Sequence, residues 1–252
     1  MSAGWLDGGL AVAPPSTWLV ALLIGGHLLG DFLFQTGRMA GGKRQVRILG
    51  SHVLVVMLVH LLALLPFLSV RVVVCVAGIG ITHAVIDAVK ARSRPRLATF
   101  LLDQGAHVLV LLGVWRLLVE WDPGIGDAPA GWVAPFVVAT VVAGALAFAA
   151  RGGSAIVSAT LAGLDPTLEP EETPPGLKGS GRLIGILERI TAVILILLGQ
   201  WAALGLLMAA KSIARFEELK ERRFAEYYLV GTLTSLLVAI VVGLVLIEVL
   251  TP

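Results

Sequence analysis

The residues with the most evident chemistry are histidines and aspartates that share apolar segments. The chain has five histidines, and all of them lie between residues 27 and 107. A spacing of four residues places two side chains on one face of a helix. Three segments carry a histidine and an aspartate at this spacing, namely His27 with Asp31, His83 with Asp87, and Asp103 with His107. Each pair therefore predicts a polar face on an otherwise apolar helix.

Imidazole and carboxylate groups together favour a divalent metal such as zinc, manganese, iron or nickel. The expected metal ligands are His27, Asp31, His83, Asp87, Asp103 and His107. Such a site can activate a bound water for hydrolysis when one coordination position stays open. We expect His52 to act as a ligand or general base and Asp31 to take part in catalysis, while His60 is expected to pack or to orient a ligand. Zinc is the first choice of cofactor, with manganese or iron as alternatives.

Two other interpretations of the cluster stay open. His–Asp pairs at this spacing also form structural hydrogen bonds between packed helices. Pathways for protons or cations use the same residue types. The polar residues lie toward one end of their segments, and the opposite halves are apolar apart from Arg116. This asymmetry disfavours a continuous path across a membrane.

The amino-acid composition indicates the environment in which this chain folds. Hydrophobic residues make up 57% of it and charged residues only 14%, and its mean hydropathy is +0.92. A water-soluble domain of this size could not bury so much apolar surface, so a lipid bilayer is expected to surround most of it. The net charge of +2 is small, which argues against nucleic-acid binding. The single cysteine, Cys75, lies in an apolar run and excludes a disulfide or cysteine-based metal site.

The apolar runs predict an all-α, polytopic transmembrane helical bundle with about seven membrane helices. A span needs roughly 20 apolar residues, and such runs occupy residues 17–36, 49–68, 71–90, 98–119, 132–150, 182–209 and 226–250. The expected organisation is a four-helix membrane unit with the His/Asp cluster at 1–120, a fifth membrane helix with its flanks at 121–163, a Pro- and Glu-rich linker at 164–180, and a C-terminal membrane hairpin at 181–252.

Basic residues set the expected orientation. The first loop carries Arg38, Lys43, Arg44 and Arg47, and the third carries Lys90, Arg92, Arg94 and Arg96. The positive-inside rule places these loops in the cytoplasm, and with them the His/Asp ends of the first four helices. One segment disagrees, because seven spans would put residues 211–223 outside although they contain five basic residues. We expect a multi-pass protein of the bacterial inner membrane.

Four motifs carry a resemblance to a known family. They are HLLGDFLFQT, SHVLVVMLVH, THAVIDAVKAR and FLLDQGAHVLVL. With them the chain resembles the bacterial domain-of-unknown-function 3307 family of membrane proteins. The resemblance extends more weakly to GRLIGILERI, AAKSIARFEEL and AEYYLVGTLTS, and omits about 120–178. The family is distantly similar to membrane-bound metal-dependent hydrolases that also carry His-x-x-x-Asp on membrane helices, an analogy that implies hydrolysis without demonstrating it.

These observations favour a metal-dependent membrane hydrolase. Its expected substrate is a membrane lipid or lipid-linked molecule that enters from the inner leaflet. Candidate substrate-binding residues are Arg38, Arg92, Glu188 and Arg189, with a structural ion pair as the alternative role of the last two. A cation- or proton-coupled transporter and a scaffold without chemistry remain alternatives, so the sequence leaves enzymatic activity open. No nucleic-acid partner is expected, and a homo-oligomer is left open.

Overall fold

The computed structural model describes residues 13–121, 130–164 and 179–250. All regular elements within these ranges are helices, and no strand occurs among them. Six helical segments are long and apolar enough to cross a membrane, namely Pro15–Leu33, Val46–Ala63, Val70–Lys90, Leu97–Trp121, Gly131–Leu164 and Arg222–Leu250. The predicted all-α membrane bundle is therefore confirmed. The helices form two compact units, one from residues 1–148 with 248–252 and the other from residues 149–247.

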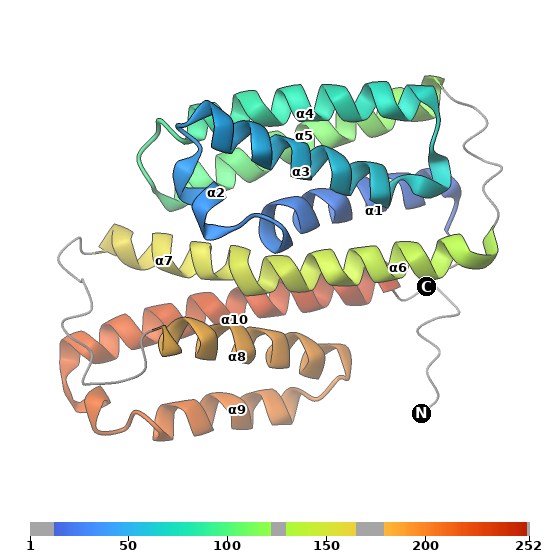
Figure 1. Ribbon diagram of the computed structural model, residues 1–252. Helices are drawn as coiled ribbons and strands as arrows, with labels where there is room; N and C mark the ends of the chain where they lie inside the picture. Colours follow the sequence, from blue (N-terminus) through green and yellow to red (C-terminus); the bar gives the residue numbers. More distant parts are fainter. Residues whose placement is uncertain (1–12, 122–129, 165–178, 251–252) are drawn as a thin grey trace. The chain divides into compact units, whose positions relative to one another are not determined.

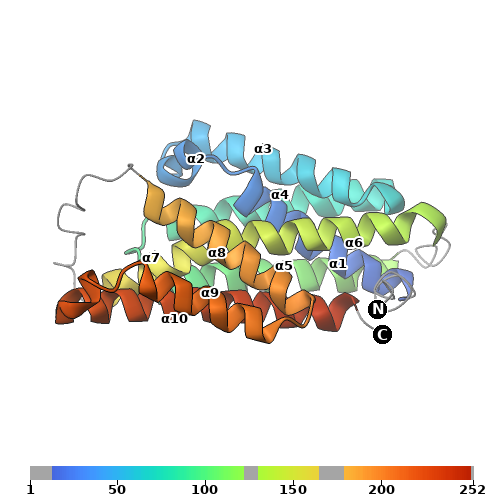
Figure 2. The ribbon, with the colours of Figure 1, turned by 90° about the horizontal axis from the view of Figure 1, so that it is seen from below.

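The first unit is built around its first helix. Its helical elements are α1 (Pro15–Leu28), the π-helical turn η3 (Leu29–Leu33), α2 (Gly37–Gly42), α3 (Val46–Ala63), the 3-10 turn η4 (Leu65–Phe67), α4 (Val70–Lys90), α5 (Leu97–Trp121) and α6 (Ala130–Ala147). α1 packs against α3, α5 and α6, and α4 packs against α3 and α5 (Figures 1 and 2). Side chains at the end of α1 consequently face several neighbouring helices.

Glycines allow this close packing around α1. A Cβ on Gly144 of α6 would lie 3.0 Å from the backbone oxygen of Gly25, and one on Gly26 would lie 3.3 Å from the Cβ of Ala63. Small residues let membrane helices approach closely enough for extensive van der Waals contact. The result is a tight core in which Leu19 and Leu22 have no exposed surface.

A π-helical turn ends α1 at the predicted site. In η3 the backbone N–H of Phe34 donates to the oxygen of Leu29 at 2.9 Å, and the turn contains Asp31. π-helical turns are rare and often occur at functional positions. Here the turn presents the Asp31 carboxylate to the helices that surround α1.

The second unit contains the C-terminal helices. It starts within the π-helical turn η6 (Phe148–Gly152) and continues through α7 (Gly153–Leu164), α8 (Ser180–Leu197), α9 (Trp201–Ile213), the 3-10 turn η7 (Glu218–Lys220) and most of α10 (Arg222–Leu250). The unit boundary thus falls inside the fifth predicted span. Most of the predicted linker at 164–180 lies outside the described residues.

The sixth predicted span, 182–209, is two helices and not one. α8 ends in a Schellman motif, in which the N–H of Gly199 donates to Ile196 O at 2.9 Å and the N–H of Gln200 donates to Leu195 O at 2.8 Å. Gly199 has a φ of 66°, a backbone conformation that favours glycine. This turn reverses the chain into α9 (Figure 2), which explains why six candidate spans are found where about seven were expected.

Candidate metal centre

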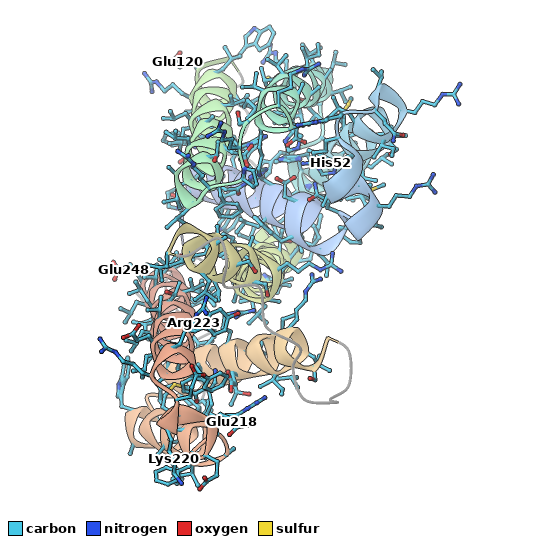
Figure 3. All side chains as sticks on the ribbon, turned by 90° about the vertical axis from the view of Figure 1, so that its left-hand side faces the viewer. His52, Glu120, Glu218, Lys220, Arg223 and Glu248 are labelled. Carbon is cyan, nitrogen blue, oxygen red and sulfur yellow. The ribbon has the colours of Figure 1, made fainter. Side chains whose placement is uncertain are left out.

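The predicted His and Asp residues come together inside the first unit. All seven are buried, namely His27, Asp31, His52, His83, Asp87, Asp103 and His107. They come from the end of α1 with η3, from the first turns of α3 and α5, and from the last turns of α4. Figure 3 shows His52 among the helices of this unit. The four segments therefore meet at matching heights, as the positions of these residues along their helices predict.

Four ligand-type atoms lie close together, and we call them the convergent atoms. They are Asp31 Oδ1, His52 Nε2, His83 Nε2 and Asp87 Oδ2. Each histidine nitrogen lies 3.3 Å from each carboxylate oxygen, and the two nitrogens lie 3.1 Å apart. In a tetrahedral zinc site with bonds of about 2.0 Å, neighbouring ligand atoms are about 3.3 Å apart. The spacing of these atoms fits such a site.

A hydrogen-bond network explains this spacing less well. Hydrogen bonds between a charged and a neutral or charged partner are typically about 2.7–2.9 Å long, and each N–H points at one acceptor. His52 Nε2 instead lies within 3.1–3.3 Å of three ligand-type atoms and 2.9 Å from Gln35 Nε2, which is more close polar neighbours than one ring nitrogen can bind by hydrogen bonds. Asp31 Oδ1 is buried and accepts no hydrogen bond of good geometry from the part of the chain that the structure describes. Near-equal separations between ligand-type atoms are typical of atoms that share one cation.

Two lysines neutralise two of the aspartates. Lys43 Nζ donates to both carboxylate oxygens of Asp87 at 2.7 Å, and Lys90 Nζ lies 2.5 Å from Asp103 Oδ2. Lys43 is itself buried, with 8% of its surface exposed. With the imidazoles neutral, as metal ligands require, three aspartates and two lysines leave one negative charge. This charge belongs to Asp31, at the point of convergence.

A second group of atoms lies beside the first. His107 Nδ1 donates to the backbone oxygen of Asp103 at 2.9 Å, so its Nε2 carries a lone pair. This Nε2 and Asp103 Oδ1 are both buried without a hydrogen-bond partner in the described part of the chain. The rings of His83 and His107 are 4.2 Å apart, and those of His27 and His107 are 4.9 Å apart. Three sets have ligand atoms within 4.8 Å of one another, namely His27/Asp31/His83, His52/His83/Asp87 and Asp87/Asp103/His107.

Several supporting residues were not singled out from the sequence. Gln35 Nε2 lies 2.9 Å from His52 Nε2, and Gln104 lies 3.4 Å from His27 Nε2. Lys43 and Lys90 were interpreted as topology signals only. The position of Lys90 could have been inferred in part from helical spacing. It follows Asp87 by three residues, which places both side chains on one helix face.

His60 has no place in the convergent group. Its Nδ1 donates to Val56 O at 2.8 Å, and it occurs in none of the three sets of ligand atoms. The packing role expected for His60 stays a prediction.

The four expected substrate-binding residues lie in different surroundings. Arg38 and Arg92 are exposed, and Arg92 donates to the backbone oxygen of Ala88 at 2.8 Å. Glu188 and Arg189 belong to the second unit. There Glu188 pairs with Lys211 at 2.5 Å, and Arg189 is buried. The expected roles of all four remain predictions.

Comparison with known protein families gives a match over part of the chain. Residues 18–124 match the model of a family described as "Protein of unknown function (DUF3307)". No curated protein and no solved structure matches the chain, so the expected distant similarity to hydrolases receives no support from these comparisons. The matched segment contains every residue of the His/Asp cluster. This part of the chain, from residue 18 within α1 through α5, is therefore similar to the DUF3307 family.

Proposed function

We propose that the convergent atoms bind one divalent metal ion, zinc by preference, and that the protein hydrolyses a lipid or lipid-linked substrate there. The near-equal spacing of Asp31 Oδ1, His52 Nε2 and His83 Nε2 carries the metal assignment. Their distances suit bonds of about 2.0 Å, the length typical of zinc with nitrogen and oxygen ligands. The absence of cysteine from the cluster favours a metal that accepts imidazole and carboxylate.

Of the four proposed ligands, Asp87 is best suited to leave the metal and open a coordination position for water or substrate. A catalytic zinc site keeps one position for water or substrate, whereas four protein ligands close it. Lys43 holds both oxygens of Asp87, so this carboxylate keeps a counter-ion when it leaves the metal. Asp31, His52 and His83 would then be the residues that hold the metal.

His107 is suited to act as the general base. Its Nδ1–H is fixed by the backbone oxygen of Asp103, and its Nε2 lone pair is buried and unused. Its ring lies 4.2 Å from that of the ligand His83. A metal ion would supply Lewis-acid activation of water and of a substrate oxygen. His107 would accept the proton from that water.

Charge favours an anionic substrate. Without metal, Asp31, Asp87 and Asp103 with Lys43 and Lys90 carry a net charge of about −1 when the imidazoles are neutral, as metal binding requires. A divalent ion raises this charge to about +1. A phosphate or carboxylate ester next to the centre would restore neutrality as negative charge develops on its oxygen. We therefore infer that acidic lipids or lipid-linked phosphates are the substrate class.

Metal analysis of the full-length protein purified in mild detergent tests the binding. We expect about one zinc ion per chain, lost in His83→Ala and in Asp31→Ala and retained in His60→Gln, the matched buried histidine outside the site. Equal, background-level metal in all four proteins would overturn the assignment. Retention in His83→Ala with the fold intact would do so as well.

Hydrolysis is tested separately from binding. The metal-loaded protein is incubated with vesicles containing acidic lipids, and products are followed by mass spectrometry. We expect product formation by the unchanged protein and at least a 100-fold loss in His107→Gln with its metal retained, in line with the contribution of a general base. Stoichiometric metal without product from any lipid class would reject the hydrolase and leave the metal site. Metal-dependent proton or cation flux in that protein would favour the transporter.

A further inference from the structure

The second unit contains a buried positive charge of its own. Arg189 in α8 has only 3% of its surface exposed. Its guanidinium donates to Ala149 O at 2.7 Å, to Ala150 O at 3.0 Å, to Ser154 Oγ at 2.6 Å and to Ser235 Oγ at 3.1 Å. All four acceptors are neutral. The arginine thus has hydrogen-bond partners but no carboxylate in contact within the described residues.

The π-helical turn η6 supplies two of these acceptors. Ala149 and Ala150 lie within η6, and Gly153 lets the arginine approach, since a Cβ there would lie 2.8 Å from Arg189 Nε. This arrangement fixes the guanidinium in place. It leaves one of the five N–H groups of an arginine unused, on the nitrogen Nη1 that also contacts Ser235.

A hollow adjoins the guanidinium. Its lining includes Glu188, Arg189, Lys211, Thr232 and Ser235. Glu188 is neutralised by Lys211, whose Nζ lies 2.5 Å from Glu188 Oε2. The lining therefore carries one positive charge, that of Arg189, which has no counter-ion among the described residues. A charge buried in an apolar surrounding is costly unless it has a counter-ion.

Hydroxyl groups of α10 accompany this charge. Tyr228, Thr232 and Ser235 are spaced by four and three residues, which places them on one helix face. The hydroxyl of Tyr228 is buried and has no hydrogen-bond partner among the described residues, and Lys211 Nζ lies 5.5 Å from the centre of its ring. Ser235 Oγ accepts a hydrogen bond from Arg189, so its own hydrogen is available to a further acceptor.

We propose that this hollow binds a singly charged oxyanion belonging to a membrane lipid. Arg189 supplies the charge, and the Arg189 N–H and Ser235 supply donors for its oxygens. Apolar side chains complete the lining, namely Ala192, Met208, Leu236 and Ala239, and they suit the adjoining hydrocarbon of a lipid. The site lies in the second unit and does not depend on the metal centre or on hydrolysis.

Lipid binding to the full-length protein is measured by native mass spectrometry from detergent. The probes are phosphatidylglycerol, oleate and inorganic phosphate, each compared with uncharged diacylglycerol. We expect phosphatidylglycerol or oleate to bind at least 10-fold more tightly than diacylglycerol. Binding of inorganic phosphate alone would contradict a lipid source, and equal binding of all four probes would overturn the oxyanion site.

Variants identify the residues responsible. Arg189→Gln is expected to lose the preference for the anionic lipid, and Ser235→Ala, which keeps the charge, to weaken it several-fold. Arg182→Gln is the matched control, because Arg182 is exposed on the same helix. Thermal unfolding and circular dichroism verify folding, and Ser235→Ala serves as the reporter if Arg189→Gln unfolds. An unchanged preference in every folded variant would overturn the proposal.

Discussion

Lys43 Nζ lies 2.7 Å from both carboxylate oxygens of Asp87, although the two residues are 44 positions apart in the chain. Both side chains are buried. The ion pair joins the loop before α3 to the last turns of α4. Asp87 Oδ2 also belongs to the four convergent atoms, so one carboxylate links the lysine to the proposed metal position.

Replacement of this lysine tests the link. Lys43→Met leaves Asp87 buried without its counter-ion, which costs about 3 kcal/mol or more in the free energy of unfolding. A bound metal would restore much of that stability. We expect chelation of metal to lower the melting temperature of Lys43→Met more than that of the unchanged protein. Arg44→Gln is the control, since Arg44 is exposed and donates to the backbone oxygen of Ala91. Equal effects of chelation on all three proteins would contradict the coupling.

Metal should also stabilise the fold directly. Ligand at 100 times its Kd raises the free energy of unfolding by about 2.7 kcal/mol, so added zinc should raise the melting temperature of the metal-free protein. Asp31→Asn removes the charge at the convergent point and is expected to abolish this rise. His60→Gln should preserve it. A rise that survives in Asp31→Asn would show that zinc binds elsewhere.

The part of this centre that could be predicted from the sequence is the part that follows from helical spacing. The pairs at four-residue spacing and their positions near helix ends were enough to predict that His83, Asp87 and His107 would meet. The contact of Lys43 with Asp87 could not be predicted in this way, because a loop residue has no helical phase. The π-helical turn at Asp31 depends on packing around α1. The break at Gly199 was missed because the apolar run continues through it.

The close approach of α1 and α6 gives a prediction about stability. Gly144→Leu would force side-chain atoms against the backbone oxygen of Gly25, which lies 3.0 Å from the position of a Cβ. Overpacking of this kind costs about 1–3 kcal/mol. Gly113→Leu is the control, since a Cβ there has no neighbour within 4 Å. Thermal unfolding should show a clear loss for the first variant and little change for the second. Similar melting temperatures for both would argue against the tight α1–α6 contact.

The turn between α8 and α9 predicts a membrane topology in which the basic segment that follows α9 obeys the positive-inside rule. α9 has 13 residues, about 20 Å of helix, which is too short for a hydrocarbon core of about 30 Å. If α8 and α9 form a hairpin that enters and leaves the membrane on the same side, residues 214–221 lie on the side of the membrane where α8 begins. With six spans, counted along the chain from the external N-terminus that the basic loops predict, that side is expected to be the cytoplasm. The basic residues between 211 and 223 then obey the positive-inside rule.

Cysteine labelling in intact cells tests this topology in a Cys75→Ala background. We expect Glu217→Cys to resist a membrane-impermeant maleimide, as does Arg94→Cys in the third loop, while Leu68→Cys reacts from outside. All three positions are exposed, so burial within the chain does not limit their reaction. Labelling of Glu217→Cys at the rate of Leu68→Cys would mean that α8 and α9 together cross the bilayer. The Schellman turn at Gly199 would then lie within a seventh span and would not form the tip of a hairpin.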